Sequence, residues 1–322
     1  MHARAGHYLT ASLAPLAPFL NRNDVTDIYV NRPGEVWTES LGGKIVPHQV
    51  TDLDEASLLR MARQVAAWTN QGISREHPLL AASLPDGSRI QVVMPPATRM
   101  GVALAIRRHV MQSLTLDDYP MVGGPMPNRV EQTTASDGGR EVGLDHPAQL
   151  RRAVKARRNI LISGGTSTGK TTFLNALMRE IDSKERLIAI EDTPEIALGQ
   201  PNSLGLLSAR NELREAAVST DDLLNAALRM RPDRIIVGEL RGSEAYTFLR
   251  TVNTGHPGSM STIHADSPEG AIKQLALLIL QTGARLSWEN IVHYVQSTVD
   301  VIVQLDRVAG RRHISAIWSN RT

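Results

Sequence analysis

The sequence contains no cysteine among its 322 residues. Disulfide bonds and thiolate zinc sites are therefore excluded, and the composition fits a reducing compartment such as the cytoplasm. Long apolar runs are also missing, because the longest, residues 275–280, is far shorter than the roughly 20 residues that cross a membrane as a helix. Pro15 and Pro18 interrupt the only apolar stretch that could resemble a signal core. We expect a soluble protein whose membrane contact is peripheral.

Neither sign of charge dominates, since 35 Lys and Arg residues face 33 Asp and Glu residues and give a formal net charge of +2. A balance this close does not indicate a dedicated nucleic-acid binder, and we expect no specific nucleic-acid binding. Hydrophobic residues make up 42% of the chain and charged residues 21%, which is ordinary for a globular protein. The length favours two domains.

Residues 1–116 are predicted to form a small α+β domain. Thr51, with Asp54 three residues later, predicts the start of a helix with one apolar face. Short apolar stretches predict strands at residues 27–30, 35–38, 44–47, 89–94 and 102–106. Gly42-Gly43 predicts a hairpin turn between the second and third of these strands. Residues 117–147 are rich in proline and glycine, so we interpret them as a linker.

Residues 148–322 change to an alternation of buried strands and amphipathic helices. Helices are predicted at residues 171–181 and 221–230. Strands are predicted at residues 159–163, 187–191, 234–238, 260–263, 299–305 and 313–318. Strands that alternate with helices indicate a mostly parallel sheet with helices on both faces, and thus an α/β domain.

A complete P-loop motif follows the first of these strands. Its glycines let backbone N–H groups turn toward phosphate oxygens, and the helix N-terminus adds a partial positive charge. Lys170 is expected to reach the β- and γ-phosphates, and the Thr171 hydroxyl to bind Mg²⁺. A glycine-rich turn that binds nothing is the alternative, but the full match between strand and helix favours ATP binding. The predicted nucleotide-binding residues are Gly164, Gly165, Thr166, Ser167, Thr168, Gly169, Lys170, Thr171 and Thr172.

Acidic residues end two of the other buried strands. Glu239 follows the apolar residues 234–238, where a Walker B carboxylate is expected, although Gly238 replaces the usual aspartate. The alternative is that Glu239 only caps the next helix. Glu191 and Asp192 end the strand at 187–191, and Glu191 and Glu239 are candidate ligands of Mg²⁺ or activators of water.

Two histidines flank a further strand of the same predicted sheet. His264 ends the strand at residues 260–263, so it could contact the γ-phosphate or position water. His256 precedes this strand and is a candidate nucleotide contact. A lone histidine is more often structural than catalytic, which is the alternative for both.

In this combination of motifs the chain resembles the secretion NTPase family that powers type II secretion, type IV pili and type IV secretion. The family joins its P-loop to an acidic box, a Walker B strand ending in Gly-Glu, and a histidine box, which here match Glu191-Asp192, Gly238-Glu239 and residues 255–264. Residues 30–37, 84–89 and 95–99 resemble the type IV secretion branch. Type II motors usually carry a four-cysteine zinc insertion, and pilus-retraction motors have a different N-terminal sequence.

The resemblance also implies a role for arginines of the N-terminal half. Arg89, Arg99 and Arg107 resemble the family's arginine box, which contacts nucleotide phosphates across the domain cleft. Guanidinium groups suit this task because they stay charged and stabilise developing phosphate charge. A solvated basic strand edge is the alternative for each arginine, and Arg108 is the alternative to Arg107.

The resemblance implies a RecA-like P-loop motor domain preceded by the smaller domain, with ATP and Mg²⁺ as cofactors. It further implies a homo-hexameric ATPase that works at the cytoplasmic side of the inner membrane, together with the subunits of a secretion channel. Its catalytic residues would be Lys170, Glu239, Glu191, His264, Arg99 and Arg107. The rival functions are a type II secretion or pilus motor, a RecA-like DNA translocase, and a nucleotide-gated scaffold that hardly hydrolyses ATP.

Overall fold

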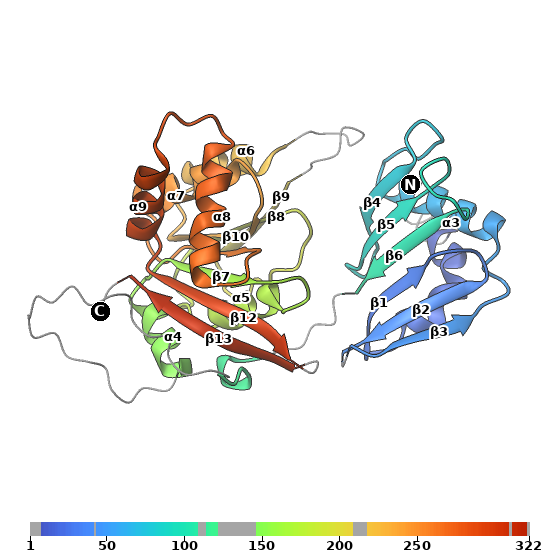
Figure 1. Ribbon diagram of the computed structural model, residues 1–322, viewed down its shortest axis with the longest axis horizontal. Helices are drawn as coiled ribbons and strands as arrows, with labels where there is room; N and C mark the ends of the chain where they lie inside the picture. The colour runs from blue at the N-terminus through green and yellow to red at the C-terminus, as the bar shows by residue number, and fades with distance from the viewer. Residues whose placement is uncertain are drawn as a thin grey trace, which may run out of the picture. The chain divides into compact units, whose positions relative to one another are not determined.

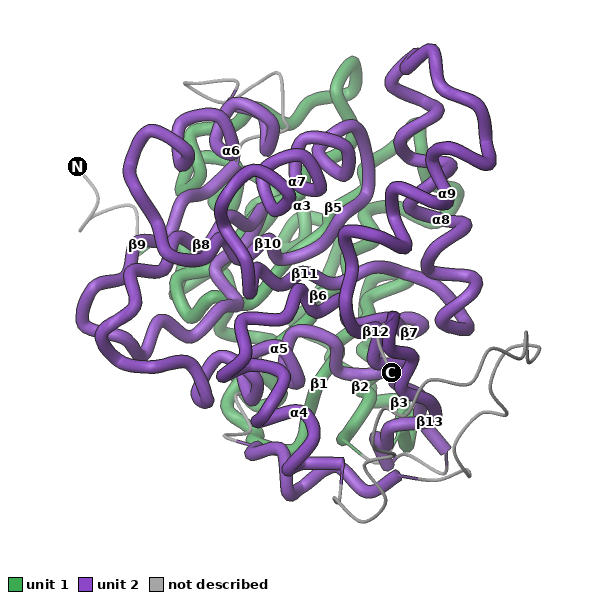
Figure 2. Tube along the Cα trace, turned by 90° about the vertical axis from the view of Figure 1, so that its left-hand side faces the viewer, with its two compact units in different colours: residues 1–111, 209–217 green, residues 112–208, 218–322 purple. Residues whose placement is uncertain are grey.

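The computed structural model describes residues 8–41, 43–108, 114–121, 146–208, 218–308 and 311–320. The chain divides into two compact units, residues 1–111 with 209–217 and residues 112–208 with 218–322 (Figure 2). The first unit thus ends before the domain boundary expected at residue 116. Residues 114–121 belong to the second unit, and the remainder of the expected linker up to residue 145 lies outside the described residues. None of the helices within these ranges has the length and apolar content that a membrane crossing requires.

The first unit contains a six-stranded antiparallel sheet in the order β3-β2-β1-β6-β5-β4 (Figure 1). Its strands are β1 (Val25–Val30), β2 (Glu35–Ser40), β3 (Ile45–Gln49), β4 (Leu79–Ser83), β5 (Arg89–Val93) and β6 (Ala103–Arg107). Residues of these strands other than β3 enter a core that also holds residues of the short helices η1 (Ala14–Leu16) and α2 (Ala17–Leu20).

One long helix, α3 (Glu55–Trp68), packs its apolar face into the same core. Leu58, Met61 and Val65 are fully buried, as the helical spacing predicts. The prediction that Thr51 caps this helix was wrong. Asp54 is the N-cap, because its carboxylate accepts the backbone N–H of Ser57 at 2.8 Å.

The second unit is built on a seven-stranded sheet in the order β13-β12-β7-β11-β10-β8-β9. Its strands are β7 (Ile160–Gly164), β8 (Leu187–Glu191), β9 (Ser203–Leu207), β10 (Arg234–Leu240), β11 (Met260–Ile263), β12 (Val301–Val308) and β13 (Arg311–Ser319). Neighbouring strands are parallel except β12 and β13. The predicted mostly parallel sheet is therefore confirmed.

Helices cover both faces of this sheet (Figure 1). They are η2 (Leu116–Asp118), α4 (His146–Lys155), α5 (Lys170–Met178), α6 (Thr220–Leu228), α7 (Glu244–Asn253), α8 (Pro268–Leu280) and α9 (Trp288–Thr298). One core lies between the sheet and α6 to α9, and another lies between the sheet and α4, α5 and η2. Successive residues of β8 alternate between the two cores, which explains why the strand is apolar throughout.

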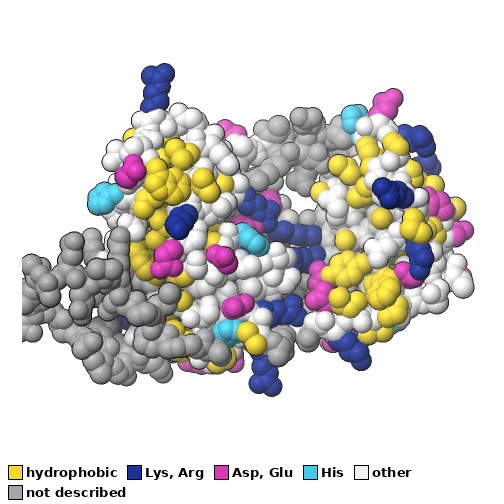
Figure 3. Space-filling model, in the orientation of Figure 1, with side chains coloured by type: hydrophobic (Ala, Val, Ile, Leu, Met, Phe, Trp, Pro, Cys, Tyr) yellow, Lys and Arg dark blue, Asp and Glu magenta, His cyan; other side chains and the backbone are white. Residues whose placement is uncertain are grey.

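Hydrophobic side chains also gather on the outer surface over α8 and α9 (Figure 3), where Leu277, Leu286 and Trp288 are exposed. The inner faces of the same helices are buried in the core through residues such as Leu275 and Ile291. The two helices therefore cover one face of the sheet with their inner sides and carry apolar residues on their outer surface as well.

Candidate nucleotide-binding and catalytic site

The P-loop connects the carboxyl end of β7 to the first turn of α5. Ser167 and Gly169 both have left-handed backbone conformations, with φ of 62° and 89°. At Gly164 a Cβ atom would lie 2.5 Å from the Thr168 hydroxyl and 2.9 Å from the carbonyl oxygen of Leu305. The loop is thus closely packed against β12, and the Thr168 hydroxyl holds its shape by donating to the carbonyl of Gly165 at 2.9 Å.

Lys170 lies at the centre of the candidate site. Its ammonium group donates to the carbonyl oxygens of Gly164 and Gly165 at 3.0 and 3.1 Å, and its Nζ is 3.6 Å from Oε1 of Glu239. The Lys170 side chain is only 11% exposed, so water screens its positive charge little at the loop. Thr171 and Thr172 follow in the first turn of α5, where backbone N–H groups have no partner within the helix.

Arg312 of β13 lies over this loop, and sequence reasoning did not identify it. Its Nη1 donates to the Thr172 hydroxyl at 3.3 Å, and its side chain would lie 2.6 Å from a Cβ atom at Gly169. Gly169 is therefore favoured by its left-handed backbone conformation, and a Cβ atom there would also displace the Arg312 side chain. Nothing near Arg312 in the sequence indicates this contact, because it joins strands and loops far apart in the chain.

Glu239 lies at the carboxyl end of β10, beside the P-loop. Val237 pairs with Ile190 of β8, so Gly238 faces Glu191 in the neighbouring strand. A Cβ atom at Gly238 would lie only 3.2 Å from Cβ of Glu191. The position of the usual Walker B aspartate is therefore held by a glycine because the Glu191 side chain of the next strand occupies the adjoining space.

Glu191 is 8% exposed and is fixed by two backbone hydrogen bonds. Its Oε2 accepts the N–H groups of Glu195 and Ile196 at 2.8 and 2.9 Å. Burial raises the pKa of this carboxyl to about 7, although the two hydrogen bonds act in the opposite direction. A carboxyl with such a pKa can hold or release a proton near neutral pH.

Arg241 connects the ends of β10 and β8 and was also missed by the sequence reasoning. Its guanidinium group contacts Oε2 of Glu239 through both Nε and Nη2, and Oδ2 of Asp192 through Nη1 at 3.0 Å. The available signal was its place two residues after Glu239. Lys170, Glu239, Arg241 and Asp192 thus form a continuous row of alternating charges.

The two predicted histidines lie at opposite ends of β11. His264 directly follows Ile263, which pairs with Ser163 of β7, so His264 lies at the P-loop edge of the sheet and is exposed. His256 precedes the strand, at the edge where β7 begins, and its Nδ1 is 3.3 Å from the carbonyl of Thr251. Within one chain the structure therefore brings His264 to the P-loop edge and places His256 away from it.

The predicted arginines lie on one hairpin of the first unit. Arg89 of β5 and Arg107 of β6 are direct cross-strand partners, so their side chains share one face of the sheet. Arg99 lies in the connection at the opposite end of the hairpin and is exposed. Arg108, the alternative to Arg107, donates to the backbone carbonyls of Arg22 and Val25 and thereby ties β6 to the start of the domain.

The residues at the P-loop fit a nucleotide phosphate and Mg²⁺. Within the described ranges no three His, Asp or Glu side chains gather in a way that would hold a metal ion alone. Mg²⁺ at nucleotide sites commonly takes one or two protein ligands together with phosphate oxygens and water. The Thr171 hydroxyl beside Lys170 and the Glu239 carboxylate have the right chemistry for this, and the left-handed loop residues provide the phosphate cradle.

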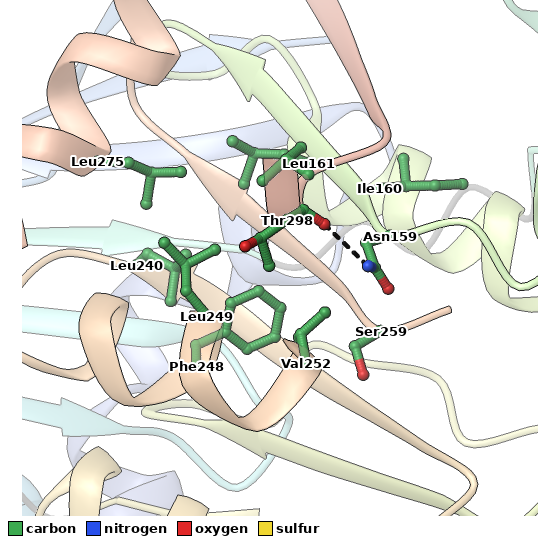
Figure 4. Close-up of a pocket in the computed structure, with 11 residues that line it drawn as sticks. Asn159, Ile160, Leu161, Leu240, Phe248, Leu249, Val252, Ser259, Leu275 and Thr298 are labelled. Atoms are coloured by element: carbon green, nitrogen blue, oxygen red, sulfur yellow. Dashed lines mark hydrogen bonds between the residues drawn. The ribbon is translucent and has the colours of Figure 1, made fainter. Parts of the chain in front are cut away.

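A small cavity elsewhere in the second unit is not a ligand site. It lies in the core between the sheet and helices α7 and α8, where apolar side chains such as Phe248 and Leu275 surround it (Figure 4). The Asn159 amide at its edge already donates to the carbonyl of Thr298 at 2.9 Å. A volume of about 10 Å³ leaves room for little more than one water molecule.

The fold and this site define a two-domain P-loop protein of the RecA-like class. Residues 10–312 match the family described as "Type II/IV secretion system protein", and the chain belongs to this family. The type IV secretion system protein VirB11 of Bartonella quintana is 36% identical over 326 residues, which cover 95% of this chain and 91% of that protein.

Solved structures agree with this assignment. The crystal structure of the VirB11 ATPase from the Brucella suis type IV secretion system in complex with sulphate is 34% identical, covers 99% of this chain and 96% of that one, and has a TM-score of 0.51. The pilus retraction motor PilT with bound ADP has a TM-score of 0.58 and covers 96% of this chain and 82% of that one. At 20% identity it shows only the shared fold. The predicted fold class and family are thus confirmed.

Proposed function

We propose that the chain is a Mg²⁺-dependent ATPase that works as a hexameric ring and drives substrate transfer, pilus assembly or both in a bacterial type IV secretion system. One observation carries the chemical part of this proposal. The ammonium group of Lys170, held at the P-loop, and the carboxylate of Glu239 approach to 3.6 Å at the same edge of the sheet. A cation suited to binding phosphate and a carboxylate suited to activating water therefore lie next to each other, which supports the proposal.

In this function the P-loop N–H groups and Lys170 hold the phosphates, Thr172 adds a hydroxyl, and Thr171 binds Mg²⁺. The metal ion supplies charge neutralisation at the phosphate oxygens. Glu239 orients the attacking water and accepts its proton, while His264 contacts the transferred phosphate or the same water. Arg99 and Arg107 stabilise phosphate charge during turnover, and Arg89 contributes to nucleotide binding.

Glu239 suits the role of base better than Glu191. It is 19% exposed and thus open to water, whereas Glu191 is 8% exposed and its Oε2 is used by two backbone N–H groups. We assign Glu191 a supporting role, in which it fixes the end of β8 beside Glu239 and helps to hold the metal ion. Because Glu239 and Glu191 have different proposed roles, separate variants of the two residues can distinguish these roles.

The cellular part of the proposal rests on the relatives. Proteins of type IV secretion systems are similar to this chain along nearly its whole length. We therefore assign it to the cytoplasmic side of the inner membrane, in contact with channel subunits of the secretion system. A type II secretion or pilus motor is less well supported because the match to PilT shows only the fold.

Phosphate release and nucleotide binding test the chemical part. Lys170→Ala should lose both ATP hydrolysis and tight binding of ADP, because alanine supplies no charge at the phosphates. Glu239→Gln should still bind ATP but release phosphate about 100-fold or more slowly, since an amide cannot accept the proton. Lys155→Ala, at an exposed lysine of α4, is the matched control.

The outcomes separate the rival functions. Circular dichroism should show that each variant is folded. Near-normal turnover by folded Lys170→Ala would refute the P-loop assignment, and no phosphate release by the wild type would favour a nucleotide-gated scaffold. If Glu239→Gln instead loses nucleotide affinity, Glu239 is a metal or structural ligand and Glu191 becomes the base. Strong, salt-sensitive DNA binding with DNA-stimulated turnover would favour a translocase.

The ring requires its own measurement. Head-to-tail contacts close into rings when their rotation closes, so sedimentation should reveal a hexamer that a non-hydrolysable ATP analogue stabilises. Specific activity should rise with protein concentration. A monomer under all conditions, with specific activity independent of concentration, would rule out the ring.

A further inference from the structure

The Arg241 side chain reaches the acids that follow both acidic strands, Glu239 near the end of β10 and Asp192 just after β8. It holds Oε2 of Glu239 through two nitrogens and Oδ2 of Asp192 at 3.0 Å through the third. The opposite oxygen of Glu239, Oε1, is the one that approaches Lys170. The two oxygens of Glu239 thus have different cationic partners.

The backbone of Arg241 is fixed independently of its side chain. Its N–H and that of Gly242 both donate to Oε1 of Glu244, at 2.7 and 2.9 Å. Glu244 is 4% exposed in the first turn of α7, so this junction between β10 and α7 is well anchored. Little conformational freedom is then lost when the guanidinium group reaches across to Asp192, which favours a persistent pairing.

We infer that Arg241 is a positioning residue that holds the Glu239 carboxylate back from Lys170, so that Lys170 stays available for nucleotide phosphate. Lys170 and Glu239 already form an ion pair at 3.6 Å, and an unrestrained carboxylate beside an ammonium group that is 11% exposed would close this distance to a hydrogen bond. That pair would compete with the phosphate for the lysine charge. The same restraint keeps Oε1 of Glu239 at the edge of the phosphate cradle, where the proposed function needs it.

This inference rests on the proposed function, and it predicts an effect on binding that is separate from catalysis. In Arg241→Ala the carboxylate is released, so the Kd for ADP measured without Mg²⁺ should rise about tenfold, within the range of closely coupled charged pairs. In a Glu239→Gln background the same change should alter the Kd less than about twofold, because an uncharged amide forms no ion pair with Lys170 and competes only weakly with phosphate.

Simple loss of a positive charge at Arg241 predicts a different pattern of Kd values. If Arg241 acted only as a distant cation that attracts phosphate, its removal would weaken ADP binding equally in both backgrounds. The double-mutant cycle therefore separates positioning from general electrostatics. Arg241→Lys keeps the charge but cannot bridge two carboxylates, so its Kd should lie between those of the wild type and Arg241→Ala.

The experiment is titration of the full chain with a fluorescent ADP analogue in EDTA, supported by thermal melts and by kcat and KM for ATP. Asp192→Asn removes the outer anchor without touching Glu239 and should shift the Kd in the same direction as Arg241→Ala. Arg285→Ala, at an exposed arginine between α8 and α9, should leave the Kd unchanged.

Additive effects of Arg241→Ala and Glu239→Gln, or an unchanged Kd in folded Arg241→Ala, would overturn the inference. Failure of the proposed function would look different, because Lys170→Ala would then bind the analogue as tightly as the wild type. If Arg241→Ala does not fold, Arg241→Lys and Asp192→Asn decide the question by the same comparison with and without Glu239→Gln.

Discussion

Replacement of Glu191 by glutamine should change how the stability of the second unit depends on pH. Glu191 is 8% exposed, and its burial raises its pKa from an ordinary value near 4.5 to about 7. The nearby acids Glu195 and Asp192 act in the same direction, while the N–H groups of Glu195 and Ile196 act against it. Glutamine keeps the size and one acceptor oxygen but has no proton to lose.

The sign follows from proton binding. Between about pH 4.5 and pH 7 the folded chain keeps a proton on Glu191 that the unfolded chain has released. Stability from this group is therefore complete below pH 4.5 and is lost as the pH rises through 7. A shift of about 2.5 pH units corresponds to about 3 kcal/mol in the free energy of unfolding. The advantage of Glu191→Gln should thus grow by about that amount from pH 4.5 to pH 8.

Urea denaturation in EDTA without nucleotide measures this difference. A background with Trp37→Phe and Trp68→Phe leaves Trp288 and Trp318 as reporters, and both belong to the second unit. Glu269→Gln, at an exposed acid of α8, is the control for the loss of one charge. A stability difference between Glu191→Gln and the wild type that stays constant with pH would refute the reasoning, because Glu191 would then already be ionised at pH 5.

Two further substitutions test the interior of the second unit, one beside the site and one at the opposite end of β10. Gly238→Ala should cost about 1–3 kcal/mol and lower turnover, since its Cβ would lie 3.2 Å from that of Glu191. Gly199→Ala, where nothing lies within 4 Å, should cost nothing, and equal stability of the two variants in urea would contradict this. Glu185→Gln should cost about 3–5 kcal/mol, because it leaves Arg234, 1% exposed, without its carboxylate partner. The volume-preserving Arg234→Met should cost less in the same urea assay, and the reverse order would contradict the charge argument.

Much of the second unit could be predicted from sequence because its signals are local. Each strand from β7 to β11 that borders the site is apolar on both faces, and the P-loop motif marks one junction between a strand and a helix. Strand β9, whose residues at the sheet edge are partly buried or exposed, and strand β4 were not predicted. Their side chains alternate in burial or face solvent, so the apolar pattern is weaker than in a central strand.

The limits of sequence reasoning are clearest at the N-terminus of α3. Thr51 and Asp54 both have side chains that can cap a helix, and sequence alone cannot choose between them. The choice depends on where the backbone leaves the extended conformation, and Asp54 has ψ of 171° just before the helix begins. An error of a few residues at a helix end is therefore expected even where the helix itself is predicted correctly.

At the site, too, the sequence indicated which residues take part but not which of them contact one another. Lys170, Glu239 and Glu191 could be named because a motif or a strand end places each of them. Arg241 could not be paired with both Glu239 and Asp192, since the contact depends on the register that sets Val237 of β10 against Ile190 of β8.

That same register explains the glycine at position 238. A Cβ atom on the residue before Glu239 would lie 3.2 Å from Cβ of Glu191, so a side chain there would force its neighbour to shift by a few tenths of an ångström. Gly238 lets the two acidic strands approach, and Arg241 then binds the acids at their ends. A substitution at Gly238 should therefore disturb Glu191 directly and the row from Lys170 to Asp192 indirectly, so its effects on turnover and on stability need not be proportional.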